Sequence, residues 1–357
     1  MNTDLKKRLE EYDILADIYR RLSIVVSQVL EKTMSDTDLR PMQIVSRIKT
    51  KESVAEKMSH KHDKYHYVRD INDLLGFRII FYFSDQMDIC AEAIKKAFNV
   101  DPKRSKDKRQ LIDPTAFGYI SLHYICSLPE DQGYPVELCG RNFEIQIRTV
   151  LQHTWAEIEH DLGYKSEFDI PREIRREFSR VAGLLEVADE VFVNLKKRIG
   201  DYKLEVCESI SNDEADDMTL DLITLTEYMN RSRTMTALLS DISAVSGAGI
   251  KEVSPEYYVE RLHFLGIQTL GDLKRFNTEE YDHALLLARN VLADKDIEEL
   301  ISTVGFFYLC RARLVFGDMD EKRIYRYYRI DETDPGYAAE QTEHIMYLRK
   351  LMRHDAH

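Results

Sequence analysis

The chain has 357 residues, a formal net charge of −13 and a hydrophobic fraction of 44%, so we expect one or two domains with packed cores. The acidic balance argues against nonspecific nucleic-acid binding over the whole surface, so any anionic ligand must meet a local basic site. The five cysteines form no Cys-x-x-Cys pair, which favours a reducing compartment. No apolar run approaches the ~20 residues of a membrane span, and the charged first residues lack a signal-peptide core. We therefore predict a cytoplasmic protein with no membrane partner.

The first part of the chain mixes helical and strand patterns. Apolar residues at helical spacing predict an amphipathic helix over 3–34, and a basic helix is expected at 51–60. The run 74–83 predicts a strand buried on both faces. A helix over 86–98 and a mobile basic loop over 101–109 are expected to follow.

Two strands with alternating polar and apolar residues come next. In the stretch 119–124, one face carries Tyr119, Ser121 and His123. In the stretch 142–148, apolar residues alternate with three polar ones, Glu144, Gln146 and Arg148. A carboxylate, an amide and a guanidinium on one strand face are suited to binding a metal and a phosphorylated ligand.

The second part of the chain is predicted to be helical. One helix is expected to stop near Gly163, and the next to run from Pro171 to near Gly200. The acidic segment 211–217 is the candidate boundary, so we predict domains at 1–205 and 219–357. Further helix starts are expected at Ser254-Pro255-Glu256 and at 277–280.

The stretch 258–276 predicts two helices around a glycine turn. A packing or oligomerisation module is favoured there over a nucleic-acid-binding hairpin. The pattern leaves open whether the second domain regulates activity, forms dimer contacts or senses a partner. For the whole chain we predict an α+β fold, with a mixed sheet of about five strands flanked by helices and a helical C-terminal region.

Two clusters of polar residues lie before the strand predicted over 74–83 and at its start. One contains Arg47, Lys49, Ser53 and Lys57, which could grip a triphosphate but also suit a solvated helix start. In the other, Asp73 stands where the strand over 74–83 begins. A carboxylate there could hold Mg²⁺, which takes one or two carboxylates in addition to phosphate and water oxygens. It could equally be a helix or turn cap.

Two further clusters lie on the alternating strands. Tyr119 offers a ring for stacking a base and His123 an imidazole for a phosphate or hydroxyl, although both also suit an ordinary strand. Glu144 is a second candidate metal ligand or a general base, and Gln146 and Arg148 could orient an acceptor.

Taken in order, these clusters resemble the synthetase domain of the RelA/SpoT family. The resemblance covers roughly residues 40–166. Its motifs are Arg-x-Lys-x3-Ser-x3-Lys from Arg47, Asp-Leu-x-Gly-x-Arg from Asp73, Gly-Tyr-x-Ser-x-His from Gly118, Glu-x-Gln-x-Arg-Thr from Glu144 and Gln-His-x-Trp-Ala-x-x-x-His from Gln152.

Enzymes of this family transfer the β,γ-pyrophosphate of ATP to the ribose 3′-hydroxyl of GDP or GTP, making (p)ppGpp and AMP. The resemblance implies a nucleotidyltransferase-like fold in which Arg47 and Arg78 sandwich the adenine. It implies further that Lys49, Ser53 and Lys57 hold the ATP phosphates. Short members of the family are often oligomers, and the sequence neither confirms nor excludes a homo-oligomer here.

The resemblance also assigns the acceptor side and the metal. Asp73 and Glu144 are implied to hold Mg²⁺, and Glu144 is implied to be the base for the 3′-hydroxyl. Tyr119 is implied to stack on guanine and His123 to contact the phosphates of the acceptor.

The sequence departs from the family pattern just before Gly118. Many members carry Asn-Pro-Lys-x-Asn there, whereas this chain has Thr115 for the lysine and Phe117 for the asparagine. Five basic residues just upstream could replace the missing phosphate contacts: Lys103, Arg104, Lys106, Lys108 and Arg109. About 40 residues precede the first motif, too few for the hydrolase domain of long family members, and His62-Asp63 is interpreted as surface. We expect a short, single-activity synthetase.

Two other functions are weighed beside GTP pyrophosphokinase. A toxin-type relative would transfer pyrophosphate to adenosine nucleotides or to the 3′ end of tRNA, with the C-terminal region as an inhibitor or sensor. The altered stretch 113–117 motivates this alternative. A non-catalytic nucleotide-binding regulator is the other alternative, although the presence of both Asp73 and Glu144 argues against it.

Overall fold

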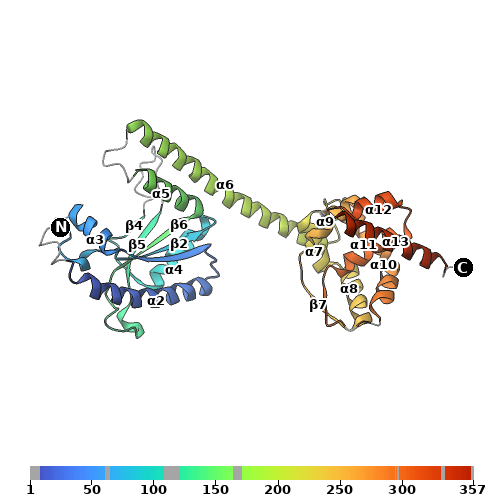
Figure 1. Cartoon of the computed structure of the whole chain (residues 1–357), viewed down its shortest axis with the longest axis horizontal. Coiled ribbons are helices and arrows are strands. Elements are labelled where there is room, and N and C mark those ends of the chain that lie inside the picture. The colour runs from blue at the N-terminus through green and yellow to red at the C-terminus, as the bar shows by residue number, and fades with distance from the viewer. Residues whose placement is uncertain are drawn as a thin grey trace. The chain divides into compact units, whose positions relative to one another are not determined.

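The chain forms two compact units, Met1–Lys197 and Arg198–His357. The computed structural model (Figure 1) describes residues 9–60, 65–107, 121–163, 171–293, 295, 297–330 and 334–354. Within those residues, none of the helices combines the length and apolar character needed to cross a membrane. Each unit has its own buried core.

A mixed six-stranded sheet is the centre of the first unit. Its strand order is β1-β2-β6-β5-β3, and β4 also pairs with β5. The bounds are β1 Gln43–Ile48, β2 Leu75–Phe81, β3 Asn99–Val100, β4 Lys106–Asp107, β5 Leu122–Ser127 and β6 Phe143–Thr149. Only the central pair β2 and β6 is parallel, and the other pairs are antiparallel.

Helices cover both faces of this sheet. In Figure 1, α2 and α4 lie on one side of the sheet and α5 on the other. The helix bounds are α2 Tyr12–Asp36, α3 Lys51–His60, α4 Asp85–Ala97, α5 Val150–Gly163 and α6 Arg172–Ser211. Short 3₁₀ turns occupy Val68–Asp70 and Glu130–Gln132.

The alternation of β6 sets which side of the sheet is the core. Phe143, Ile145 and Ile147 are fully buried in the cluster that α2 and α4 complete. Burying each such side chain contributes roughly 1.5–3 kcal/mol. A slip of one residue would move all three to the other face, so Glu144 and Gln146 are held on the opposite, polar face.

Three features of the first unit differ from the sequence-based expectations. Strand β1 was not predicted, because it is an edge strand whose residues are mostly exposed and its basic residues suggested a helix start. Part of the expected mobile loop over 101–109 is strand, since Lys106 and Asp107 pair with β5. Helix α6 does not end near Gly200 but continues to Ser211.

The second unit is mainly helical, as expected. Its helices are α7 Leu222–Arg231, α8 Arg233–Ser246, α9 Glu256–Phe264, α10 Leu270–Leu292, α11 Val304–Phe316, α12 Glu321–Tyr328 and α13 Pro335–His354. Most of α11 is buried, including Phe306, Leu309 and Leu314, which makes it the central helix of the core. The end of α6 contributes Ile210, which is partly buried against this core.

Two expectations for the second unit were wrong. The short parallel strands β7 Gly249–Lys251 and β8 Glu299–Ile301 interrupt the helices. The predicted helix start at 277–280 lies inside α10, which begins at Leu270 after a reciprocal cap. Thr269 Oγ1 accepts from the Asp272 amide at 3.1 Å, and the Asp272 carboxylate accepts from the Thr269 amide at 3.0 Å. The predicted glycine turn is present, since Gly266 after α9 has φ +88°.

The predicted division into 1–205 and 219–357 stays a prediction. The two compact units divide between Lys197 and Arg198, a point inside α6. The 40-residue helix therefore contributes side chains to both units.

Candidate functional site

One row of paired positions crosses five strands on the polar face of the sheet. Val45 in β1 pairs with Arg78 in β2, and Arg78 pairs with Gln146 in β6. Gln146 then pairs with His123 in β5, and His123 with Lys106 in β4. Directly paired residues on neighbouring strands point to the same face. The sheet thus aligns two cationic side chains with an amide and an imidazole.

A second row lies two residues further along the strands on the same face, and it lacks one side chain where the pocket forms. Arg47 pairs with Gly76, and Gly76 pairs with Glu144. A Cβ built on Gly76 would meet nothing within 4 Å, so the missing side chain leaves open space between Arg47 and Glu144.

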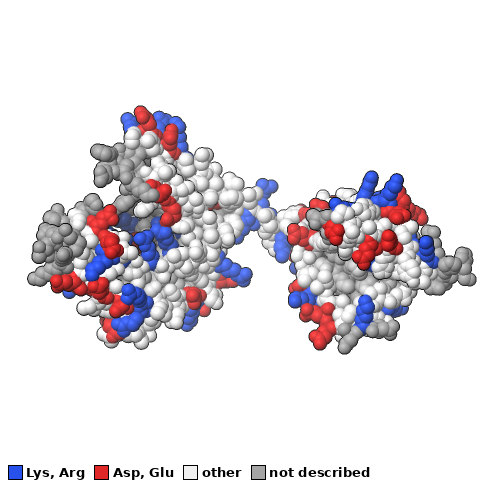
Figure 2. Space-filling model, viewed as in Figure 1, with Lys and Arg blue, Asp and Glu red and all other residues white. Residues whose placement is uncertain are grey.

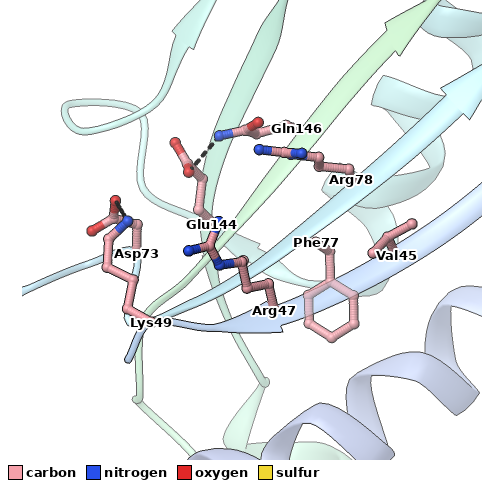
Figure 3. A pocket seen from close by; sticks show the side chains of 9 residues that line it. Val45, Arg47, Lys49, Asp73, Phe77, Arg78, Glu144 and Gln146 are labelled. Atoms are coloured by element: carbon pink, nitrogen blue, oxygen red, sulfur yellow. Dashed lines mark hydrogen bonds and ion pairs between the residues drawn. The ribbon is translucent and has the colours of Figure 1, made fainter. Parts of the chain in front are cut away.

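Figure 3 shows this pocket and the nine residues that line it: Val45, Arg47, Lys49, Asp73, Gly76, Phe77, Arg78, Glu144 and Gln146. Arg47 and Arg78 extend over it from neighbouring strands, and the two carboxylates lie on its other side. Figure 2 shows Lys and Arg side chains gathered in a hollow of the first unit, between acidic side chains. The local basic site that an acidic chain needs for an anionic ligand is therefore present.

Asp73 stands between two lysines at the start of β2. Its carboxylate lies 3.1 Å from Lys49 Nζ and 2.6 Å from Lys57 Nζ. Burial by itself would raise the pKa of Asp73, but the hydrogen bond and charge of Lys57, together with Lys49, outweigh burial and lower it. The carboxylate is consequently ionised at neutral pH, and both ammonium groups are held beside the pocket.

Glu144 is the second ionised carboxylate. Its Oε1 lies 2.8 Å from His123 Nδ1, and its Oε2 accepts from Gln146 Nε2 at 2.7 Å. Burial opposes the charge, but the hydrogen bonds from His123 and Gln146 outweigh burial and lower the pKa of Glu144. Gln146 Oε1 in turn accepts a hydrogen bond from the buried Arg148. Arg148 thereby fixes the orientation of the Gln146 amide.

The remaining polar contacts attach neighbouring elements to this site. Arg78 Nη1 donates to Glu157 Oε1 of α5 at 2.7 Å. Arg104 donates to Asn72 Oδ1 at 3.3 Å, next to Asp73 in sequence. Ser53 lies in the first turn of α3, where its amide donates to Thr50 Oγ1 at 3.3 Å.

The sequence-predicted site residues fall into four groups. Six line the pocket: Arg47, Lys49, Asp73, Arg78, Glu144 and Gln146. Lys57, His123 and Arg148 adjoin it through the contacts above, whereas Ser53 lies at the start of α3 and forms its hydrogen bonds with Thr50. Tyr119, Lys108 and Arg109 lie outside the described residues. The roles assigned to all of them stay predictions.

Sequence analysis did not single out Val45, Phe77 or Glu157. Val45 and Phe77 are ordinary strand residues, and nothing in their neighbours marks them. Glu157 lies within the Gln-His-x-Trp-Ala-x-x-x-His stretch that carries the resemblance, but only the fold brings it to Arg78.

Two carboxylates of the pocket are the oxygen ligands that the site offers to Mg²⁺. Among the described residues, His, Cys, Asp and Glu side chains form no group of three or more able to hold a metal. Asp73 and Glu144 provide two ionised carboxylates, and Mg²⁺ in phosphate-binding sites takes its other oxygens from phosphate and water. The residues therefore fit Mg²⁺ that arrives with a nucleotide, and they do not form an all-protein metal cage.

The fold and site define an α+β protein with a pocket in which cationic side chains face two carboxylates. A family model described as "Region found in RelA / SpoT proteins" matches residues 46–169, the segment that carries both rows of polar residues. GTP pyrophosphokinase YwaC of Bacillus subtilis is 31% identical over 157 residues, which cover 43% of this chain and 73% of that protein. The chain belongs to the RelA/SpoT family.

Two other relatives are similar to this chain. GTP pyrophosphokinase YjbM of Bacillus subtilis is 28% identical over 171 residues, which cover 46% of this chain and 76% of that protein. The structure of small alarmone synthetase 1 from Bacillus subtilis bound to its product pppGpp covers 54% of this chain and 99% of its own. Its identity is 24% and its TM-score 0.46.

Proposed function

We propose that this protein transfers the β,γ-pyrophosphate of ATP to the 3′-hydroxyl of GDP or GTP, making (p)ppGpp and AMP. The observation that carries the proposal is the pocket in which Arg47, Arg78 and Lys49 face the ionised carboxylates of Asp73 and Glu144. Membership of the RelA/SpoT family and relatives named GTP pyrophosphokinases support it.

On the donor side, the guanidinium planes of Arg47 and Arg78 offer stacking surfaces for adenine. Lys49 and Lys57 bind the phosphates, and Ser53 contributes from the first turn of α3. Both lysines are paired with Asp73. Arriving phosphates compete for these ammonium groups, which leaves the Asp73 carboxylate available for another cation.

Asp73 and Glu144 are the residues that would hold Mg²⁺. When bound, the ion would neutralise charge on the phosphate oxygens. The fit rests on two carboxylates that are ionised at neutral pH.

On the acceptor side, Glu144 stays ionised because of its hydrogen bonds and is able to accept a proton. The 3′-hydroxyl oxygen forms a bond to Pβ, the bond from Pβ to the AMP oxygen breaks, and the hydroxyl proton passes to Glu144. Such a transfer depends mainly on in-line positioning and charge neutralisation. Gln146 and Arg148 hold Glu144 in place for it.

The phosphates of the acceptor need cations near His123. Lys106 pairs with His123 across β4 and β5, and Arg104 reaches Asn72 beside Asp73. These positions support the basic stretch as the source of the phosphate contacts that Thr115 and Phe117 do not supply. Tyr119, the proposed guanine-stacking residue, lies outside the described part of the chain.

An acceptor panel tests the function. Purified protein receives ATP labelled in the β,γ-phosphates together with GDP, GTP, unlabelled ATP or tRNA. Transfer to GDP or GTP with equimolar AMP release is expected. Labelled tRNA or adenosine nucleotides alone would replace the proposal with the toxin-type reading. If folded protein releases no AMP with any acceptor, the hypothesis of a non-catalytic regulator remains.

The substitution Glu144→Gln tests the proposed base. Gln keeps the size of the side chain and its carbonyl still accepts from Gln146, so folding is expected to survive. We expect kcat to fall by roughly 10²–10⁴-fold, the usual contribution of a general base. Glu130→Gln, which removes an exposed carboxylate from the short turn before β6, is the control and should keep normal turnover.

A further inference from the structure

We propose that Glu157 is a positioning residue for ATP, acting through Arg78 to hold one of the two arginine surfaces that receive the adenine. The proposal rests on the proposed function above. Arg78 comes from β2 and Glu157 from α5, 79 residues later, and their side chains meet at 2.7 Å. The pair joins the helix on the polar side of the sheet to the pocket wall.

Stability does not account for this ion pair. The Arg78 side chain is 36% exposed and that of Glu157 is 51% exposed. Ion pairs at such positions contribute little to folding, because water screens them and two long side chains must be ordered. What the pair does provide is a fixed direction for a guanidinium that lines the pocket.

The geometry leaves Arg78 suited to stacking. Glu157 accepts from Nη1 only, at the tip of the planar group, so the bond need not cover either face of the plane. Gln146 lies beside Arg78 in the same row of the sheet (Figure 3). His153, one turn before Glu157, lies 3.8 Å from the same Glu157 oxygen, which places a ring beside the carboxylate.

Arg47, the opposite arginine, is arranged differently. Among the side chains that the structure describes, no carboxylate is paired with Arg47, and it is exposed on the edge strand β1. The adenine site therefore combines one guanidinium that is held in advance with one that is able to adjust on binding. Holding a side chain in its bound orientation improves affinity, because less side-chain entropy is lost when the ligand binds.

The first test compares Glu157→Gln with Glu31→Gln, the same change at an exposed position on α2, on the other side of the sheet. For Glu157→Gln we expect a KM for ATP about three- to tenfold higher, with kcat within about twofold of the original. Equilibrium binding of a non-hydrolysable ATP analogue should weaken by a similar factor. Glu31→Gln should change neither quantity.

The second test asks whether Glu157 acts through Arg78. Once Arg78→Gln is in place, adding Glu157→Gln should cause no further loss of ATP-analogue binding. Additive losses, or an unchanged KM in Glu157→Gln while Arg78→Gln weakens binding, would overturn the inference and leave the proposed function standing. If the unaltered protein releases no AMP, it is the proposed function that fails. The binding measurements still decide on Glu157.

Discussion

At the scale of single residues, Asp189 is a buried carboxyl group outside the pocket. It lies on α6 with only 4% of its surface exposed, and its Oδ2 accepts from Thr149 Oγ1 at 2.7 Å. Its Oδ1 has no hydrogen-bond partner among the described residues. Thr149 ends β6, the strand that carries Glu144, and its Oγ1 also accepts from the Gln152 amide at 3.1 Å. The contact thus attaches the end of the site strand to α6.

Burial raises the pKa of Asp189 above its usual 3.8, although the hydrogen bond from Thr149 acts in the opposite direction. A carboxyl whose pKa is raised by folding stabilises the protein below its unfolded pKa, and that contribution is lost as the pH rises through the folded pKa. Asp189→Asn stays neutral and avoids the cost of a buried carboxylate charge, so we expect it to be more stable than the unaltered protein at pH 7 by about 1 kcal/mol.

Thermal melts of both proteins from pH 4 to pH 7 measure this difference. The advantage of Asp189→Asn should shrink as the pH falls. The exposed Asp201→Asn on the same helix serves as the control. If the unaltered protein is the more stable of the two at pH 7, other interactions must offset the cost of burying the Asp189 charge.

At the scale of elements, the pocket depends on a missing side chain in β2. Gly76 lies between Arg47 and Glu144 on the polar face, and its φ is not positive, so other residues are able to adopt its conformation. A side chain added there would enter the pocket and not the core.

We therefore expect Gly76→Leu to fold but to lose ATP binding by at least about tenfold, and Gly76→Ala to lose less. The change in unfolding free energy should stay within about 1 kcal/mol, since a Cβ at this position meets no neighbour within 4 Å and the rest of the side chain extends into the pocket. Calorimetric titration with a non-hydrolysable ATP analogue, with a thermal melt on the same samples, measures both effects. Normal binding by Gly76→Leu would mean that the nucleotide does not occupy this space.

At the scale of the whole molecule, the two units have separate cores. The core of the first unit gathers around β2, β6, α2 and α4, and that of the second around α10 and α11. The two clusters share no buried residue, so each unit is expected to unfold as its own cooperative transition.

Phe306→Ala probes that independence. Phe306 is fully buried in α11 and lies 5.8 Å from the ring of Tyr258, centroid to centroid. Its truncation should destabilise the second unit by about 3–5 kcal/mol and lower one of two calorimetric transitions. The neighbouring Phe307→Ala, 40% exposed, should have a much smaller effect. If both transitions shift together with Phe306→Ala, the units are energetically coupled.

Several parts of the fold and site could be predicted because their signal is local. The burial of Phe143, Ile145 and Ile147 follows from the alternation of their own strand, as does the polar direction of Glu144. Long amphipathic helices such as α2 are identified by their periodicity. Gly200 illustrates the limit of local rules, since one glycine costs only about 1 kcal/mol in a helix and α6 continues through it to Ser211.

By itself, the sequence determined the family motifs, the two central strands and most of the charged residues that line the pocket. The tertiary structure alone decided that Lys106 stands opposite His123, that Gly76 opens a gap between Arg47 and Glu144, and that Glu157 reaches Arg78. The physical reason is the distance along the chain over which each interaction acts. The alternation or helical spacing of apolar residues is set by which of them are buried, and it can be seen within a short stretch of sequence. Cross-strand register and ion pairs between distant residues depend on which elements the core brings side by side.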